Sequence, residues 1–544
     1  MAVPDRPNFN AENPSRGGLN GKAADMARAT RIIRNFYRDS VSLMQLSSTL
    51  AKLPGVEQAS VIMASANNVN LLKEAGLLIG TVEAGANDLL IALQGDADAL
   101  DAALAAAESA LKQPPVSATG NGKLRVITPR SIEMGLGHMV GANLALISTP
   151  GEYAAAEAFK ALSLGLNVML FSDNVELKDE IALKRFAQDH GLIVMGPDCG
   201  TAIINGIPLA FANVVKRGEI GVVAASGTGL QQVTCLVDRW GKGISQAIGT
   251  GGHDLHKEVG GVSMLQGLKA LAADRSTSVI VLISKPPAPD VAGRVLEAAG
   301  EAGKPVVVNF LGADPERIKR ANVFAAGTLE DAAAAAVALT DGRKPDDGRL
   351  RCPPIAFPSK LAPTQRYIRG LYSGGTFCYE AALLLKKALG QVYSNTPVEP
   401  GDRLNDVWTS HGHTVIDLGD DLFTRGRPHP MIDHRLRNER MIKEVEDPEV
   451  AVILLDVVLG YGSHPDPAGE MVPVIEKARD LASKAGRDLA IVGFVCGTSA
   501  DPQNLLRQET ALRTAGVILA ESSAQAVRMA TTLASEAGAI GRVL

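Results

Sequence analysis

The chain has 544 residues and a formal net charge of −5; 46% of its residues are hydrophobic and 4% are aromatic. The length predicts three or four domains, and the composition is typical of a cytoplasmic α/β protein with reduced thiols. The net negative charge and the lack of a basic run argue against nucleic acid as a partner. No run of about 18 apolar residues occurs, so we expect no membrane span.

The N-terminal part divides into a tail and a small domain. Residues 1–29 are polar and rich in Asn, Pro and Gly, which predicts a flexible tail. In residues 30–112 we expect strands at 35–39, 59–63 and 88–94 and helices at 43–53, 69–75 and 100–111. This alternation predicts a small α+β domain of the ferredoxin-like type. Between the second strand and its helix, an N-cap at Ser65 or Asn67 is favoured over an anion-binding turn.

Residues 124–217 follow a linker at 113–123 and have the pattern of a doubly wound, Rossmann-like unit. We expect strands at 124–127, 144–148, 167–171 and 192–195 and helices at 153–164 and 177–190. No GxGxxG pattern follows the first strand, so a dinucleotide is not indicated.

The third unit, residues 218–340, opens with a buried-strand pattern at Ile220–Ala225. A loop of small residues interrupts it, and apolar residues at helical spacing follow. This arrangement directs free backbone N–H groups and a helix N-terminus at an anion. The residues of this unit that we expect to bind a phosphate or carboxylate are Ser226, Gly227, Thr228, Gly229, Gly251 and Gly252.

The fourth unit, residues 366–544, repeats the third after a Pro-rich linker at 341–365. Its own loop of small residues also stands between a predicted strand and a predicted helix. The binding residues expected here are Ser373, Gly374, Gly375, Thr376 and Asp420. The repetition predicts two flavodoxin-like domains that face each other and line a shared site.

Three side chains are candidates for catalysis. Lys285 ends the predicted strand at 279–284, where a cation can neutralise a phosphoryl oxygen or a developing oxyanion. His429 and Arg427 lie in a proline-braced loop. His429 can act there as a general acid/base, and Arg427 can bind a carboxylate in bidentate fashion. A surface lysine, a loop histidine and a backbone-bound arginine are the alternative interpretations.

Other polar residues are weaker candidates. Asp420 can orient the loops or bind Mg²⁺, but a helix N-cap is favoured. His411 and His413 fall on one face of a strand, and a metal site is disfavoured because clear companion ligands are lacking. Cys199 is a conceivable nucleophile without a neighbouring base in the sequence.

Several segments carry a family resemblance over nearly the whole chain beyond the tail. GEIGVVAASGTG, IGTGGHDL, MGPDCG and the twin C-terminal units resemble the succinyl-CoA synthetase (ADP-forming acyl-CoA synthetase) superfamily. SDNVELKDEIALK, IDLGDDLF and RPHPMID look like its FdrA branch. The resemblance implies a CoA-binding-type domain at 124–217 and CoA-ligase-type domains at 218–340 and 366–544.

The sequence departs from the synthetases at three points. No histidine stands between His256 and His411, so the phosphate-carrying histidine of the family is missing. The nucleotide-supplying ATP-grasp domain has no counterpart. A ferredoxin-like unit replaces the Gly-rich start of the CoA-binding fold.

The FdrA resemblance implies part of an oxamate carbamoyltransferase, which converts oxalurate and phosphate into oxamate and carbamoyl phosphate. Phosphate is then a substrate, CoA binding stays open, and no metal is expected. The resemblance also implies separately encoded partner subunits and an oligomer. Two alternatives stay open. One is the core of an acyl-CoA synthetase with a partner-supplied nucleotide site, and the other is a non-catalytic scaffold or regulatory subunit.

Overall fold

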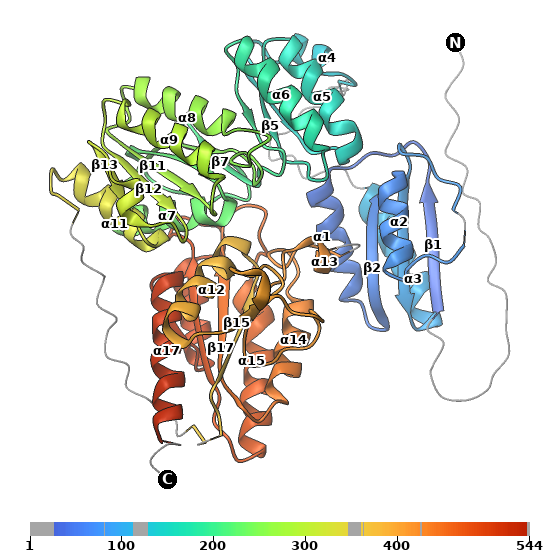
Figure 1. Ribbon diagram of the computed structural model, residues 1–544. Helices are drawn as coiled ribbons and strands as arrows, with labels where there is room; N and C mark the ends of the chain where they lie inside the picture. The colour runs from blue at the N-terminus through green and yellow to red at the C-terminus, as the bar shows by residue number, and fades with distance from the viewer. Residues whose placement is uncertain are drawn as a thin grey trace, which may run out of the picture. The chain divides into compact units, whose positions relative to one another are not determined.

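The computed structural model describes residues 27–80, 82–112, 129–345, 361–362, 364–424 and 427–540 (Figure 1). The chain forms two compact units. Unit 1 comprises Met1–Ser131 with Asp421–Asp433, and unit 2 comprises Ile132–Asp420 with His434–Leu544. The predicted strand at 124–127, the linker at 113–123 and most of the predicted tail and of the linker at 341–365 lie outside the described residues.

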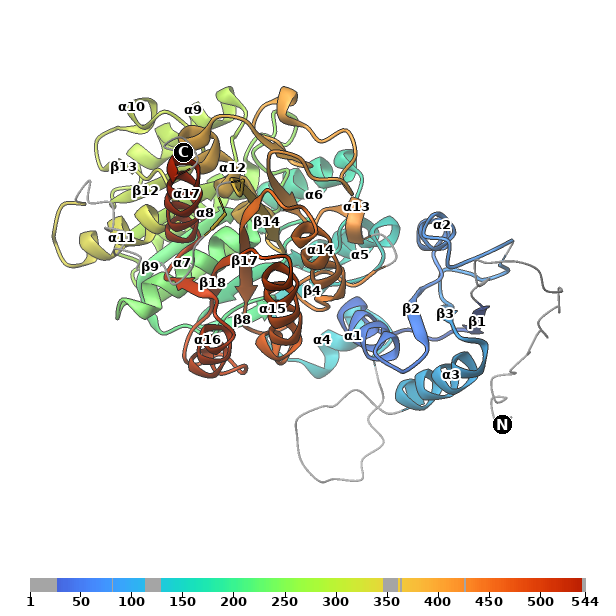
Figure 2. The ribbon, with the colours of Figure 1, turned by 90° about the horizontal axis from the view of Figure 1, so that it is seen from below.

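Unit 1 contains an antiparallel sheet in the order β1-β3-β2. Its elements are β1 (Ala27–Ile33), α1 (Ser40–Ala51), β2 (Val56–Met63), α2 (Ala66–Glu74), β3 (Leu89–Gly95) and α3 (Ala97–Lys112), together with the short α13 (Asp421–Thr424). Leu89, Ile91 and Leu93 pack with α1 and α3, while Leu90 and Ala92 face the α2 side. This alternation places the helices on opposite faces of the sheet (Figure 2).

Two local predictions in unit 1 have different outcomes. The predicted strand at 35–39 is wrong, because the chain turns at Asn35, which has φ 50°, and Asp39 then caps α1. The carboxylate of Asp88 holds this turn by accepting the Asn35 amide at 2.9 Å and the Arg34 guanidinium at 2.7 Å. The predicted N-cap at Ser65 is confirmed, since its hydroxyl accepts the Asn68 amide at 3.3 Å.

Unit 2 begins with a three-stranded parallel sheet in the order β4-β5-β6. Its elements are α4 (Ile132–His138), β4 (Leu144–Ile147), α5 (Gly151–Ser163), β5 (Asn167–Leu170), α6 (Leu177–Asp189) and β6 (Val194–Met195). Alanines of α5 form its core with Ile147, Val168, Leu170 and Val194 of the strands.

A seven-stranded sheet follows, in the order β13-β12-β11-β9-β10-β7-β8. The elements are β7 (Thr201–Ile204), β8 (Ile207–Ala210), β9 (Arg217–Ala225), α7 (Gly227–Arg239), β10 (Ile244–Gly249), α8 (Val262–Ala273), β11 (Val279–Ser284), α9 (Pro289–Gly300), β12 (Val306–Phe310), α10 (Pro315–Ile318), β13 (Val323–Ala325) and α11 (Leu329–Thr340). The hairpin β7–β8 lies inside the predicted range 124–217, yet it pairs with β10 of this sheet.

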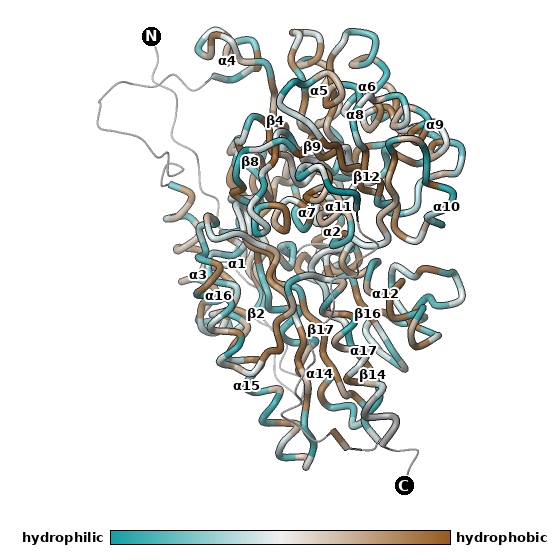
Figure 3. Tube along the Cα trace, turned by 90° about the vertical axis from the view of Figure 1, so that its left-hand side faces the viewer, coloured by the Kyte–Doolittle hydropathy of each residue, from teal (hydrophilic) through white to brown (hydrophobic). Residues whose placement is uncertain are grey.

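The last sheet has six parallel strands in the order β15-β16-β14-β17-β18-β19. The elements are β14 (Tyr367–Tyr372), α12 (Gly375–Leu389), β15 (Val392–Ser394), the 3-10 helix η1 (Pro400–Asp402), β16 (His413–Asp417), α14 (Arg435–Val445), β17 (Val450–Val458), α15 (Pro467–Lys484), β18 (Ala490–Cys496), α16 (Leu505–Thr514), β19 (Ile518–Ala520) and α17 (Ser523–Ile540). The central strands of the last two sheets are buried along their length and hydrophobic in Figure 3. Parallel strands with helices on both faces have this character, and the predicted α/β class is confirmed. Among the described residues, no helix is long and apolar enough to cross a membrane.

Candidate functional site

The two loops of small residues meet inside unit 2. Ser226 Oγ and Thr376 Oγ1 lie 2.6 Å apart in a buried hydrogen bond. A side chain on Gly374 has no room, because its Cβ would stand 2.9 Å from Thr228 Cγ2. The predicted approach of the two loops is therefore confirmed, and it brings the carboxyl ends of β9 and β14 together.

The first loop presents the N-terminus of α7, a 13-residue helix. Ser226 caps this helix by accepting the Gly229 amide at 2.9 Å. Within the part of the chain that the structure describes, the amides of Gly227 and Thr228 have no hydrogen-bond partner. Such orphan donors at a helix N-terminus favour an anion.

The second loop already holds an anion, and that anion belongs to the protein. Asp456 Oδ1 accepts the Ser373 amide at 2.8 Å, and Oδ2 accepts the Gly374 amide at 2.9 Å and the Ser373 hydroxyl at 2.8 Å. Arg437 neutralises the carboxylate at 2.9 Å, and both side chains have 0% exposure. The prediction that Ser373 and Gly374 bind substrate phosphate is corrected here, because an internal carboxylate occupies their amides.

Gly251, which follows β10, is required by packing. Gly251 has φ +82°, and a Cβ there would lie 2.1 Å from the carbonyl oxygen of Pro197. Buried Lys184 anchors the same loop by donating to the Thr250 carbonyl at 3.0 Å and to Asp254 Oδ1 at 2.8 Å. The close approach of the Pro197 carbonyl oxygen explains why position 251 requires glycine, whereas Gly252 is exposed.

Lys285 stands beside the first loop. Ser284 pairs with Ala225, and these are the last residues of the neighbouring strands β11 and β9. Lys285 and Ser226 therefore directly follow the ends of two neighbouring strands. Strands in a sheet lie about 4.8 Å apart. The lysine is exposed, and its positive charge lowers the pKa of the Asp417 carboxyl in the other domain. A cation and the first loop therefore share one edge of the seven-stranded sheet.

Asp417 ends β16 next to the second loop, level with Tyr372 of β14. Burial raises the pKa of its carboxyl to about 6, against the lowering effect of Lys285; the charge of Asp420 adds to the rise. Asp420, a predicted ligand, is half-buried in the loop that follows. Lys285 and Asp420 therefore both act electrostatically on Asp417.

Arg427 and His429 belong to the Asp421–Asp433 segment of unit 1, so the structure does not assign them to the Lys285 site. His429 Nδ1 accepts the Met431 amide at 3.2 Å. Desolvation lowers the pKa of the His429 ring to about 4. The ring is therefore neutral and weakly basic at pH 7, and the acid/base role of His429 stays a prediction.

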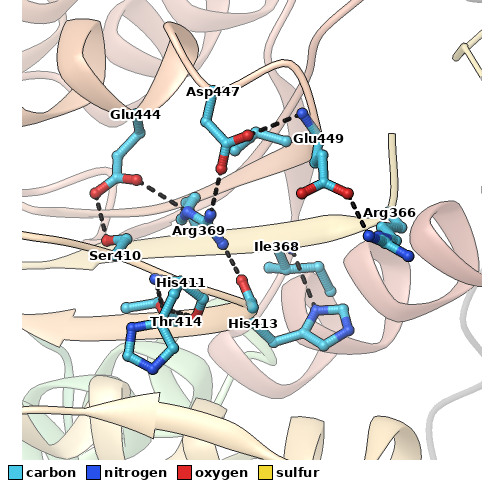
Figure 4. A network of polar contacts seen from close by, with 12 residues as sticks. Arg366, Ile368, Arg369, Ser410, His411, His413, Thr414, Glu444, Asp447 and Glu449 are labelled. Carbon is cyan, nitrogen blue, oxygen red and sulfur yellow. Dashed lines mark hydrogen bonds and ion pairs between the residues drawn. The ribbon is translucent and has the colours of Figure 1, made fainter. Parts of the chain in front are cut away.

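His411 and His413 do not point at a common centre. His413 Nδ1 accepts the Ile368 amide at 3.3 Å, while the His411 ring lies on Tyr393 with centroids 3.9 Å apart. Burial and the nearby arginines Arg369 and Arg366 lower the pKa of His413 to about 4. Figure 4 shows the surrounding network at the amino ends of β14 and β16, the edge opposite the two loops.

Fully buried Arg369 organises that network by binding Glu444 at 2.9 Å and Asp447 at 2.7 Å (Figure 4). These contacts stabilise the fold. No group of three or more His, Cys, Asp or Glu among the described residues can hold a metal ion. Cys199 is buried, and burial raises the pKa of its thiol to about 12, which argues against a nucleophile at this position.

The sequence interpretation missed Asp417 and Asp456. Asp456 is the only acidic residue in the otherwise apolar strand Val450–Val458, whose residues are all buried. An acidic side chain in such a strand requires a buried partner. That pattern was the available signal for Asp456, whereas Asp417 resembles any acidic residue at a strand end.

Three family models match parts of the chain. The model described as "CoA-ligase" matches residues 371–533, and "CoA binding domain" matches residues 215–312. The latter lies on the third unit, where the resemblance implied a CoA-ligase-type domain. A third model, "AllF, heavy metal-associated domain", matches residues 26–126. That segment contains neither cysteine nor histidine, and its only soft metal ligands are the thioethers of Met26, Met44 and Met63.

The chain is 47% identical over 494 residues to "Uncharacterized protein YahF" of Escherichia coli, with 90% of this chain and 95% of that one covered. It is 27% identical to succinate–CoA ligase [ADP-forming] subunit alpha 2 of Archaeoglobus fulgidus, over 30% of this chain and 58% of that one. It is also 27% identical to the sulfoacetate-CoA ligase subunit SauD of Bilophila wadsworthia, over 30% and 54%. The chain thus spans little more than half the length of these two ligase subunits. Among solved structures, an acetyl-coenzyme A synthetase of Ca. Korarchaeum cryptofilum aligns with a TM-score of 0.31 and 14% identity, over 74% of this chain and 84% of that one.

Proposed function

Because the chain belongs to the same family as Escherichia coli YahF and has a succinyl-CoA synthetase-like scaffold, we propose that it is a subunit of an enzyme that transfers an acyl or carbamoyl group to or from phosphate. The reaction that we favour converts oxalurate and phosphate into oxamate and carbamoyl phosphate. Separately encoded partner subunits complete the enzyme. The ligase relatives carry the word subunit in their own names, which supports this part of the proposal.

The observation that carries the proposal is the orphan N-terminus of α7 with Lys285 beside it. Phosphate binds to the amides of Gly227 and Thr228 and to the Thr228 hydroxyl. Since Asp456 fills the second loop, only the first loop takes phosphate, and the acyl carbonyl lies between phosphate and Lys285. The lysine then stabilises the oxyanion that forms when phosphate attacks.

The step needs no phosphorylated carrier. A phosphate oxygen attacks the carbamoyl carbon of oxalurate, and a tetrahedral intermediate forms. The bond from that carbon to the amide nitrogen then breaks, and the nitrogen leaves as the amide of oxamate after taking the proton that the phosphate gave up. The lack of histidine between His256 and His411 is consistent with this direct transfer.

A second function has its own support. The CoA-binding and CoA-ligase models match residues 215–312 and 371–533, and two relatives are named as CoA ligase subunits. In this alternative the chain is the core of an acyl-CoA synthetase, and a partner supplies the nucleotide site. Phosphate then occupies the same first loop as part of an acyl phosphate.

The test uses the chain co-expressed with its partner subunits. Phosphate-dependent formation of carbamoyl phosphate from oxalurate supports the first function, and CoA-dependent ATP turnover supports the second. Lys285→Met should lower kcat/KM by about 100-fold or more, the usual effect of losing one oxyanion partner. Lys269→Met, on the exposed face of α8, is the matched control. If Lys285→Met and Ser226→Ala leave every activity intact, a non-catalytic subunit is favoured.

A further inference from the structure

We propose that Asp417 carries the proton of the transfer site, accepting it from the attacking phosphate and passing it to the leaving nitrogen. This inference rests on the proposed function. The geometry that points to it is a rigidly held, almost fully buried carboxylate with one oxygen left unpaired beside the two loops.

The position of Asp417 is fixed from both sides of its backbone. Asn395 accepts the Asp417 amide at 2.9 Å and donates to its carbonyl at 3.0 Å. The Gly419 amide donates to Oδ1 at 3.0 Å. Oδ2 stands 2.4 Å from where a Cβ on Gly375 would lie, so the carboxylate presses on the first residue of α12.

The second carboxylate oxygen has no hydrogen bond. Asp417 is 6% exposed, and among the described residues no donor reaches Oδ2. Oδ2 is not among the fully buried polar atoms although the residue is mostly buried, so a proton or a ligand donor can reach it. Oδ2 lies beside Gly375, and the next residue, Thr376, meets Ser226 of the first loop, so a phosphate bound at the first loop is the ligand that we infer for Oδ2.

The charges that face Asp417 come from four elements. Lys285 follows β11, Asp420 lies in the loop after β16, Asp456 is in β17 and Cys378 is in the first turns of α12. Lys285 favours the ionised carboxylate, whereas burial and the two aspartates favour the protonated form. A group balanced in this way exchanges protons near neutral pH, which suits a general base that later acts as an acid.

Asp417 both accepts and donates the proton of the chemical step. Ionised Asp417 takes the proton from the hydroxyl of hydrogen phosphate as the oxygen–carbon bond forms. Protonated Asp417 then donates through Oδ2 to the amide nitrogen as the carbon–nitrogen bond breaks. The carboxylate returns to its starting state, and no further reactant is required.

Asp417→Asn tests the proposal because asparagine has nearly the same shape and does not titrate. The co-expressed complex should show a carbamoyl-transfer rate that rises with pH around an apparent pKa near 6. The variant should lose at least about 100-fold in kcat with a small change in KM for phosphate, and the rise should vanish. Asp480→Asn, an exposed residue of α15, is the control and should keep the wild-type profile.

A second measurement does not depend on activity. The folded-state pKa of Asp417 is raised, so wild type loses stability as pH increases through about 6, and the variant does not. The Tm of Asp417→Asn relative to wild type should therefore rise by about 2 °C or more between pH 5 and pH 8. A flat difference overturns the proposal.

The remaining outcomes also test the role of Asp417. An activity rise near pH 6 that survives in Asp417→Asn overturns the proton-carrying role. If the wild-type complex transfers no carbamoyl group, the proposed function fails. The proton-carrying role of Asp417 is then tested by calorimetry of inorganic phosphate binding in two buffers, which measures the protons taken up on binding. Proton uptake on binding that is absent in Asp417→Asn supports the inference; unchanged uptake, or no phosphate binding at all, overturns it.

Discussion

Replacing Asp456 by asparagine should destabilise unit 2 strongly. The change removes the negative charge that Arg437 binds at 2.9 Å, and it places an amide group against the N–H donors of Ser373 and Gly374. Arg437 cannot release its proton, so it stays charged and fully buried without its partner.

The magnitude follows from these contacts. Leaving one member of a buried ion pair alone costs about 3–5 kcal/mol. Asparagine keeps one acceptor oxygen, so part of the hydrogen bonding to the loop survives, and we expect a loss of about 4 kcal/mol. Arg437→Met should cost less, because Asp456 keeps three other donors from Ser373 and Gly374.

Tryptophan fluorescence measures this effect selectively, since the only two tryptophans, Trp240 and Trp408, both lie in unit 2. Urea unfolding of Asp456→Asn, Arg437→Met and the double variant gives a thermodynamic cycle, with Asp480→Asn as control. We expect the double variant to be more stable than additivity predicts, by about 2 kcal/mol. A loss below about 1 kcal/mol in Asp456→Asn, or strict additivity, would refute the assignment of this pair as the anion and cation of the second loop.

Three further predictions concern other buried groups. Lys184→Met should cost about 3–5 kcal/mol, because it leaves Asp254 buried without its cation and Glu180 with His253 alone; an unchanged denaturation midpoint would contradict this. The His413 pKa is depressed from 6.5 to about 4, so wild type should lose stability as pH falls through this window. Thermal melts at pH 7 and 4.5 should show His413→Gln losing less, and equal losses would count against this reasoning. Iodoacetamide at pH 8 should modify Cys199 only after unfolding, and mass spectrometry of folded protein that finds it labelled would rule this out.

The sequence allowed the strand–loop–helix units to be predicted because buried parallel strands are continuous apolar runs. It also indicated that Ser226 and Thr376 belong to equivalent loops, and the structure brings their hydroxyls together. The occupant of the second loop could not be predicted in this way. Asp456 lies 83 residues from Ser373, and no local pattern encodes a side-chain contact over that distance.

Two other differences concern single segments. The first strand ends at Ile33 instead of occupying 35–39, because the carboxylate of Asp88, far along the chain, holds Asn35 in a turn. The hairpin Thr201–Ala210 was missed although it carries a recognisable signal. The signal is the dipeptide Asn205-Gly206, which is typical of a two-residue hairpin turn, and both residues have the positive φ that such a turn requires.

That hairpin has a consequence for how the gene can be divided. Arg217 donates to the Asn205 carbonyl at 2.7 Å, and Gln246 accepts the Asn205 amide at 2.7 Å, so the turn is tied to β9 and to β10. A recombinant fragment that starts at codon 218 lacks β7 and β8. The edge of β10 is then unpaired and can act as a template for self-association. Expression boundaries and natural recombination breakpoints that preserve the seven-stranded sheet therefore fall no later than Thr201.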